Sequence, residues 1–159
     1  MPKQETVSLR KTLAELLRMK GAHVSLHDAV SDFPPELRGV KLPGAPHTAW
    51  QLLEHMRLAQ EDILDFSRNP KYKEKTFPDD YWPATEAPPS EQAWAKSIEK
   101  FDKDLKQMQE LIAETKNDLL VKLPHGTGQT LLREVLLVAD HNAYHLGQLM
   151  FLRKILENR

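Results

Sequence analysis

Three histidines have the residue type and the spacing to bind a metal ion. His141 and His145 lie four residues apart in a segment dense in apolar residues, so on a helix both imidazoles would face one side, about 6 Å apart along the axis. Two imidazoles hold a divalent ion weakly, and a third ligand from a facing helix would complete the site. His55 lies in the middle of another amphipathic segment. The sequence therefore predicts a divalent metal site formed by His55, His141 and His145.

A histidine pair at helical spacing is also compatible with ordinary half-buried side chains that bind nothing. All three histidines, however, interrupt apolar helix faces, where unpaired imidazoles would carry a desolvation cost. Spacing alone leaves both interpretations open. The sequence has no cysteine, which excludes disulfides, thiolate ligands and a cysteine nucleophile. Imidazole ligands suit zinc or nickel first, and iron and manganese are also compatible.

The composition limits the partners of the chain. Lys and Arg number 22 against 23 Asp and Glu, a formal net charge of -1, so no excess of either sign would attract nucleic acid. A length of 159 residues suits one domain, and residues 1–159 are expected to form it. The first 17 residues contain no apolar run of the kind found in signal peptides or membrane spans, so no membrane partner and a cytoplasmic location are expected.

Hydrophobic periodicity predicts an all-α fold with four principal helices. The predicted ranges are residues 7–20, 48–67, 91–119 and 131–156. Thr48 with Gln51 forms a capping box, and Ser90 is an N-cap candidate. A second capping box at Ser25 predicts a further short helix that stops before Pro34. The long connections before the second principal helix and after it favour a four-helix bundle with crossovers.

Three segments carry a resemblance to a known family: residues 47–55 (HTAWQLLEH), 79–83 (DDYWP) and 140–148 (DHNAYHLGQ). The chain resembles the DinB/YfiT-like superfamily over nearly its whole length, and the third segment is the most specific. The resemblance implies a bundle in up-down-down-up order that pairs as a homodimer. It also implies a metal held by one histidine of the second principal helix and two of the fourth, and all three matching positions are histidine here.

The three histidines and the resemblance together lead to the hypothesis of a metal-dependent enzyme that acts on a small molecule, either by hydrolysis or by transfer to a low-molecular-weight thiol, although the resemblance by itself does not decide the reaction. Three neutral imidazoles leave coordination positions open for such chemistry. No further catalytic residue is predicted. A non-catalytic metal-binding or stress-response module, in which the ion stabilises the bundle, is the alternative. A metal-free bundle that functions through dimerisation is a third interpretation.

Two other groups of histidines are weaker candidates. His23 and His27 also lie four residues apart, but the cap at Ser25 leaves His23 outside the helix, so the two do not share a helix face. His47 precedes the start of the second principal helix and would approach the site only if the chain curls inward. We expect it to be an exposed loop histidine.

Four other side chains are candidates for the surroundings of the site. Asp62 and Gln148 share helix faces with proposed ligands and could contact them or accept a proton, although Asp62 is expected to be solvated. Trp82 is the tryptophan expected to line a pocket. Tyr144 is expected to pack in the core and receives no catalytic role.

Overall fold

The computed structural model describes residues 3–19 and 21–158, and every regular element in them is helical. The elements are α1 (Lys3–Leu17), α2 (Leu26–Val30), a 3-10 turn (Pro35–Leu37), α3 (Ala49–Arg68), α4 (Glu91–Ala113) and α5 (Leu131–Glu157). The predicted all-α class is therefore confirmed. Within the described part of the chain, no helix combines the length and apolar character needed to cross a bilayer.

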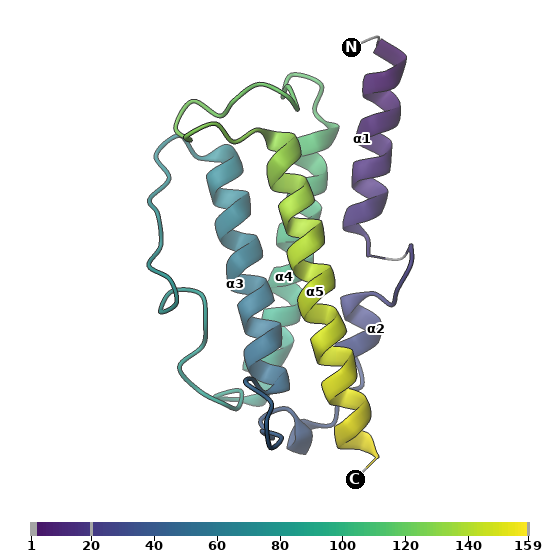
Figure 1. Cartoon of the computed structure of the whole chain (residues 1–159), viewed down its shortest axis with the longest axis vertical. Helices are drawn as coiled ribbons and strands as arrows, with labels where there is room; N and C mark the ends of the chain where they lie inside the picture. Colours follow the sequence, from purple (N-terminus) through teal and green to yellow (C-terminus); the bar gives the residue numbers. More distant parts are fainter. Residues whose placement is uncertain (1–2, 20, 159) are drawn as a thin grey trace.

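The four long helices form the predicted bundle, in which α3 and α4 run parallel (Figure 1). Near the start of both helices Ser97 donates a hydrogen bond to Glu54 at 2.7 Å, and near their ends Arg68 contacts Gln107. Helices α1 and α5 run in the opposite direction (Figure 1). Residues 69–90 connect the parallel pair and return along the length of α3, as this order of helices requires.

Side-chain caps set the starts of the helices. Thr48 accepts a hydrogen bond from the backbone of Gln51, whose side chain accepts one in return, and Ser25 begins α2 with the same type of capping box. Ser90 and Thr130 cap α4 and α5 through their hydroxyls. Each cap contributes about 1 kcal/mol to helix stability. The starts of α2, α3 and α4 were predicted from these residues because capping is local in sequence.

The prediction for the end of α4 is wrong, since the helix stops at Ala113 rather than at residue 119. The guanidinium of Arg10, on α1, donates to the carbonyl oxygens of Ile112 and, at 2.6 Å, of Asn117. The bond to Ile112 satisfies a carbonyl group that a longer helix would satisfy internally. The chain then turns across the bundle and buries Leu119, which is 3% exposed.

The other boundaries lie closer to the predictions. Helix α3 is shifted by one residue and α5 extends one residue further than expected. Helix α1 begins at Lys3 rather than at residue 7 and ends at Leu17. The predicted end at residue 20 lies outside the described residues.

The buried apolar side chains form two clusters along the bundle. One contains Leu53 and Leu146, and the other contains Leu64 and Val135. Near the middle of α3, Gln60 donates to the backbone carbonyl of Phe101 at 2.7 Å. Its side-chain oxygen accepts a hydrogen bond from Asn142 of α5 at 2.9 Å. This buried polar contact fixes the level at which α3 and α5 meet.

Candidate metal centre

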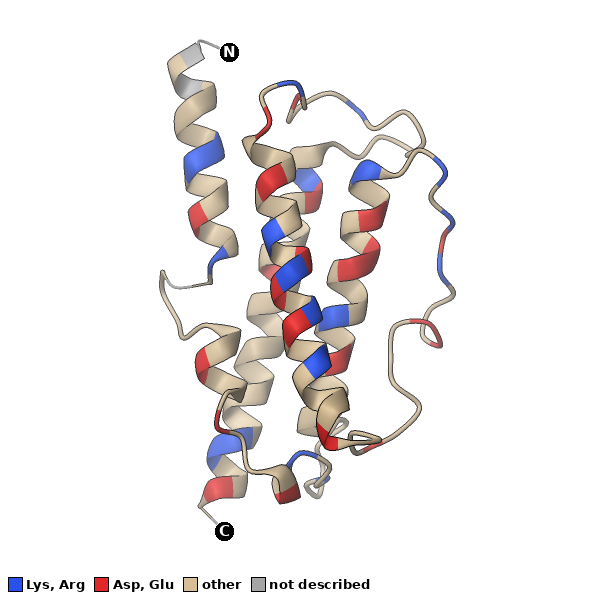
Figure 2. Ribbon diagram, turned by 180° about the vertical axis from the view of Figure 1, so that it is seen from behind, with Lys and Arg blue, Asp and Glu red and all other residues tan. Residues whose placement is uncertain are grey.

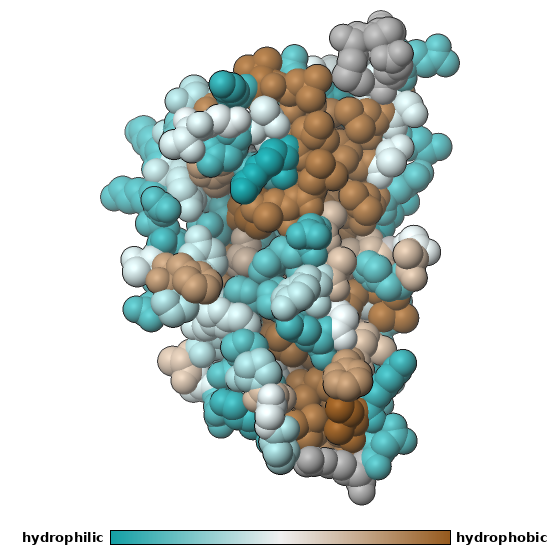
Figure 3. Space-filling model, viewed as in Figure 1, coloured by the Kyte–Doolittle hydropathy of each residue, from teal (hydrophilic) through white to brown (hydrophobic). Residues whose placement is uncertain are grey.

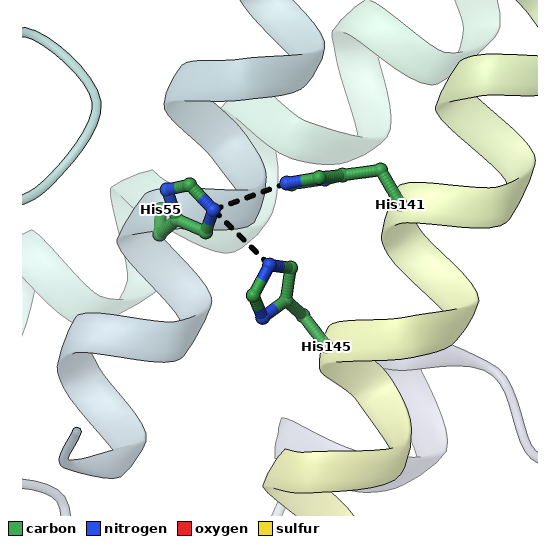
Figure 4. Close-up of side chains that lie close together, drawn as sticks. All are labelled: His55, His141 and His145. Carbon is green, nitrogen blue, oxygen red and sulfur yellow. Dashed lines mark hydrogen bonds between the residues drawn. The ribbon is translucent and has the colours of Figure 1, made fainter. Parts of the chain in front are cut away.

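The three predicted histidines converge between α3 and α5 (Figure 4). The Nε2 atom of His55 lies 3.0 Å from Nε2 of His141 and 3.2 Å from Nε2 of His145. One nitrogen of each ring lies within 4.8 Å of the others. Nitrogens that bind one tetrahedral ion at about 2.0–2.1 Å are roughly 3.3 Å apart. The three-histidine group could therefore hold a metal ion.

Helix geometry places these rings together. One helical turn separates His141 from His145, and their ring centroids are 4.6 Å apart. His55 reaches them from α3, which runs antiparallel to α5 (Figure 1). The next residue after each of two ligands, Met56 and Leu146, packs in the apolar core, with 0% and 2% exposure. Core packing on both helices thus holds the imidazoles in register.

Hydrogen bonds at the far nitrogens orient two of the rings. Nδ1 of His55 lies 2.7 Å from the carbonyl oxygen of Tyr81, and Nδ1 of His145 lies 2.7 Å from Oε1 of Gln148. Both partners are acceptors, so each Nδ1 carries the proton and each Nε2 presents a lone pair. Two lone pairs that face each other at 3.2 Å repel unless a cation lies between them. The donor set therefore fits a divalent metal.

Burial keeps the imidazoles neutral. Desolvation lowers the pKa of His55 to about 4, against the opposing effect of the Tyr81 carbonyl, and the neighbouring His145 lowers it further. Desolvation also lowers the pKa of His141 to about 4, and it lowers the pKa of His145. At neutral pH protons compete weakly for these nitrogens, which favours metal binding.

Trp82 covers one side of the site, in agreement with its predicted place in a pocket. Its ring stacks on His55, with centroids 3.8 Å apart and planes within 2°. His47 stacks on the opposite face of the indole, also at 3.8 Å. His47 lies in the loop before α3, as predicted, but it is half-buried rather than exposed, because residues 69–90 fold back and bring Trp82 beside the start of α3.

Asp62 is buried, contrary to the prediction that it is solvated. It is 7% exposed and accepts hydrogen bonds from the hydroxyl of Tyr81 at 2.6 Å and from that of Tyr72 at 3.0 Å. Burial, together with the hydrogen bond to this carboxylate, raises the pKa of Tyr72 to about 12, and the same causes raise the pKa of Tyr81. Both hydroxyls therefore stay protonated and act as donors. No local sequence pattern indicates these contacts.

A cavity of about 490 Å³ lies beside the three histidines. Besides the three histidines, its lining residues include Asp62, Phe77, Tyr81, Trp82 and Leu137. The histidine nitrogens thus lie at the wall of a space that can admit a small molecule.

The remaining candidates have different positions. Gln148 contacts a proposed ligand, as its spacing predicts. Tyr144 is 64% exposed, so its predicted place in the core is wrong, although its ring meets that of His145 edge-on. His23 and His27 are exposed and do not join a metal-binding group within the described residues. The cap at Ser25 separates them, as expected.

Fold and site together define a class: a helical bundle with a three-histidine group that could hold a metal between two antiparallel helices. The family model of the DinB superfamily matches residues 10–149. The chain therefore belongs to the DinB superfamily, which confirms the resemblance seen in the sequence. Searches of curated proteins and of solved structures gave no match.

Proposed function

We propose that the protein is a metal-dependent enzyme that acts on a small molecule, by hydrolysis or by transfer to a low-molecular-weight thiol. The observation that carries this proposal is the position of the three Nε2 atoms at the wall of the cavity of about 490 Å³. All three donors come from α3 and α5, so an ion held there would keep coordination positions on the cavity side. Open positions of this kind are typical of catalytic rather than structural metal sites.

Each nearby residue has a defined part in this proposal. His55, His141 and His145 would hold the ion, for which zinc or nickel is favoured by the all-imidazole donor set. A bound ion would supply a Lewis acid that lowers the pKa of a thiol or of water. Gln148 orients one ligand through its hydrogen bond. Trp82 stacks on another and shields it from solvent on that side.

A non-catalytic metal-binding or stress-response module is the second candidate. One observation favours it: the ligands belong to two helices, so an ion would fasten α3 to α5 and stabilise the bundle. A ligand that binds only the folded state at a hundredfold excess over its Kd contributes about 2.7 kcal/mol. Melting with and without a chelator measures this contribution, and an enzyme is distinguished from the module by turnover.

A homodimer is also part of the proposal. Apolar side chains gather on the surface over one half of α5 and the adjacent α1 (Figure 3). Leu16 of α1 and Leu136 of α5 are 47% and 46% exposed. Burying such a patch in a second copy of the chain would remove it from water. Light scattering on the wild type and on Leu136→Glu tests this, with a dimer expected only for the wild type.

Elemental analysis tests the metal site directly. Protein prepared without a histidine tag or a nickel column is compared with His55→Ala, His145→Ala and the exposed control His23→Ala. About one ion per chain is expected in the wild type and the control, and none in the two ligand variants. Absence of metal from the wild type, even after reconstitution, would refute the proposal. With metal bound, hydrolytic and thiol-transfer substrates are screened, and His145→Ala is expected to abolish any turnover found.

A further inference from the structure

Asp62 differs from two other buried carboxylates in its partners. Asp104, which is 1% exposed, pairs with Lys100 at 2.6 Å, and Glu134, which is 2% exposed, pairs with Arg133 at 2.8 Å. Asp62 is 7% exposed and accepts hydrogen bonds from two tyrosine hydroxyls, but it forms no ion pair with any described residue. A buried carboxylate without a cation loses hydration that no opposite charge replaces. The fold therefore leaves a negative charge available to a ligand.

Asp62 lines a cavity in which aliphatic and aromatic residues form much of the remaining wall. Asp62 contributes to the cavity of about 490 Å³ beside the histidines and to an adjoining one of about 420 Å³. Phe77, Tyr81 and Trp82 line the first cavity, and Phe77 is 73% exposed. Aromatic faces attract organic cations, and a carboxylate accepts hydrogen bonds from an ammonium group. A carboxylate among rings is therefore suited to an amine.

The hydrogen bonds from the two tyrosine hydroxyls leave Asp62 able to accept further hydrogen bonds. A carboxylate has about four lone-pair positions, whereas the described donors are the hydroxyls of Tyr81 and Tyr72. Both tyrosines belong to the connection at residues 69–90 and hold the carboxyl group in one place. Asp62 is thus fixed as an acceptor, with capacity for the N–H groups of a ligand.

We propose that Asp62, with the rings of Phe77 and Tyr81, forms a binding site for the ammonium group of the substrate. The opposite end of that substrate would reach the three-histidine group, and this part of the inference rests on the proposed function. Asp62 follows His55 by seven residues on one face of α3, which separates their Cα atoms by about 10 Å along the axis. The substrate class is therefore a small amine with a metal-binding group several bonds from its nitrogen.

A first experiment uses metal-free protein, so that it does not depend on the metal. Binding of n-butylammonium and of 1-butanol is measured by ligand-observed NMR at neutral pH in the presence of a chelator. The wild type is expected to prefer the ammonium at least tenfold, as a hydrogen-bonded charge pair in a partly dry site allows. Equal binding of the two compounds would overturn the inference, and this comparison requires no variant.

Variants then assign the preference to one carboxylate. Asp62→Asn is expected to abolish it, because the side chain keeps its shape and loses its charge. Asp65→Asn is the matched control, since Asp65 lies on the same helix, bonds to Asn69 and is not among the residues that line either cavity. Tyr72→Phe, which removes a hydroxyl and leaves the charge, is expected to keep the preference. Loss in Asp65→Asn or retention in Asp62→Asn would contradict the assignment.

A second experiment uses cobalt-loaded protein and separates this inference from the proposed function. Aminoalkanethiols with two to four carbons are compared with hydroxyalkanethiols of the same lengths through the thiolate-to-cobalt absorption. At one chain length the amine is expected to bind at least tenfold tighter, and Asp62→Asn should remove the difference. Thiol binding without any preference for the amine would refute the ammonium site and leave the metal site intact. If the metal-free protein prefers the ammonium but takes up no cobalt, the metal site is refuted and the ammonium site stands.

Discussion

Helix α3 presents polar groups to both of its long neighbours, but the two sides are satisfied differently. On the side of α4, Arg57 pairs with Glu54 at 2.6 Å and with Glu61 at 2.7 Å. Lys100 of α4 pairs with Glu61 at 3.1 Å and with Asp104 at 2.6 Å. Charges of both signs are interspersed along these helices (Figure 2). Every carboxylate of this network has a cation within the protein.

The side of α3 that faces α5 lacks such pairing of opposite charges. His55 directs a lone pair at the imidazole of His145, and Asp62 has no cationic partner among the described residues. Both groups line a cavity, whereas the charges facing α4 lie against one another. Groups that satisfy one another stabilise the fold, and buried groups left unmatched beside a cavity indicate a ligand site. The contrast can be tested by disturbing each side separately.

The largest effect is expected for removal of a metal ligand. His55→Ala and His145→Ala should each weaken metal binding by about a thousandfold, beyond the 10- to 100-fold typical of groups that only orient ligands. Competition with a coloured chelator measures the affinity. The side facing α4 provides the control, since Arg57→Met should leave metal affinity unchanged. If metal affinity changes little in both alanine variants, the ion is bound at another site.

Breaking the paired side should instead reduce stability. Arg57→Met leaves Glu54 without its cation, and Glu54 is largely buried, with a side chain 15% exposed. The free energy of unfolding is expected to fall by about 3 kcal/mol. Urea denaturation of metal-free protein measures it. A change below about 0.5 kcal/mol, the usual size for exposed positions, would mean that the network is solvated.

The unmatched side should also make stability depend on pH. Burial lowers the pKa of His55 to about 4. As the pH falls through 6.5, the unfolded chain therefore binds a proton at this histidine that the folded chain does not bind. Metal-free protein should therefore be stable above pH 6.5 and lose stability as the pH falls toward 4. Between pH 6.5 and 5 this histidine alone contributes on the order of 2 kcal/mol.

Thermal melts across this pH range, with chelator present, provide the measurement. His55→Gln should melt with a shallower dependence on pH than the wild type. The exposed His27 serves as the control, and His27→Gln should behave as the wild type does. Parallel profiles for all three proteins would show that His55 binds protons equally in the folded and the unfolded chain, so that burial does not lower its pKa.

The smallest effect is expected for a residue that orients a ligand without binding the ion. Gln148→Ala removes the acceptor that holds Nδ1 of His145. Metal affinity should fall about tenfold, and the metal-free stability should change little because Gln148 is only half-buried on α5. Chelator competition and urea denaturation together measure both. An unchanged affinity would show that packing alone orients the ring.

The sequence predicted those features of the site that depend on local spacing. Two histidines one turn apart share a helix face wherever that helix lies, and the apolar periodicity of residues 131–156 indicated the helix. Thr48 and Ser90 indicated two helix starts because a cap bonds within its own first turn. The third ligand, His55, came from its position in an apolar face and from the family resemblance.

Only the tertiary structure decided the features that join distant segments. Burial of Asp62 and the stacking of His47 both follow from the path of residues 69–90, which returns along α3 and places Tyr81 and Trp82 against it. The early end of α4 follows from its contact with Arg10, about a hundred positions earlier in the chain. Periodicity and capping report the first few neighbours of a residue along the chain. The second half of the site is made of contacts between residues far apart in sequence, which exist only once the bundle has formed.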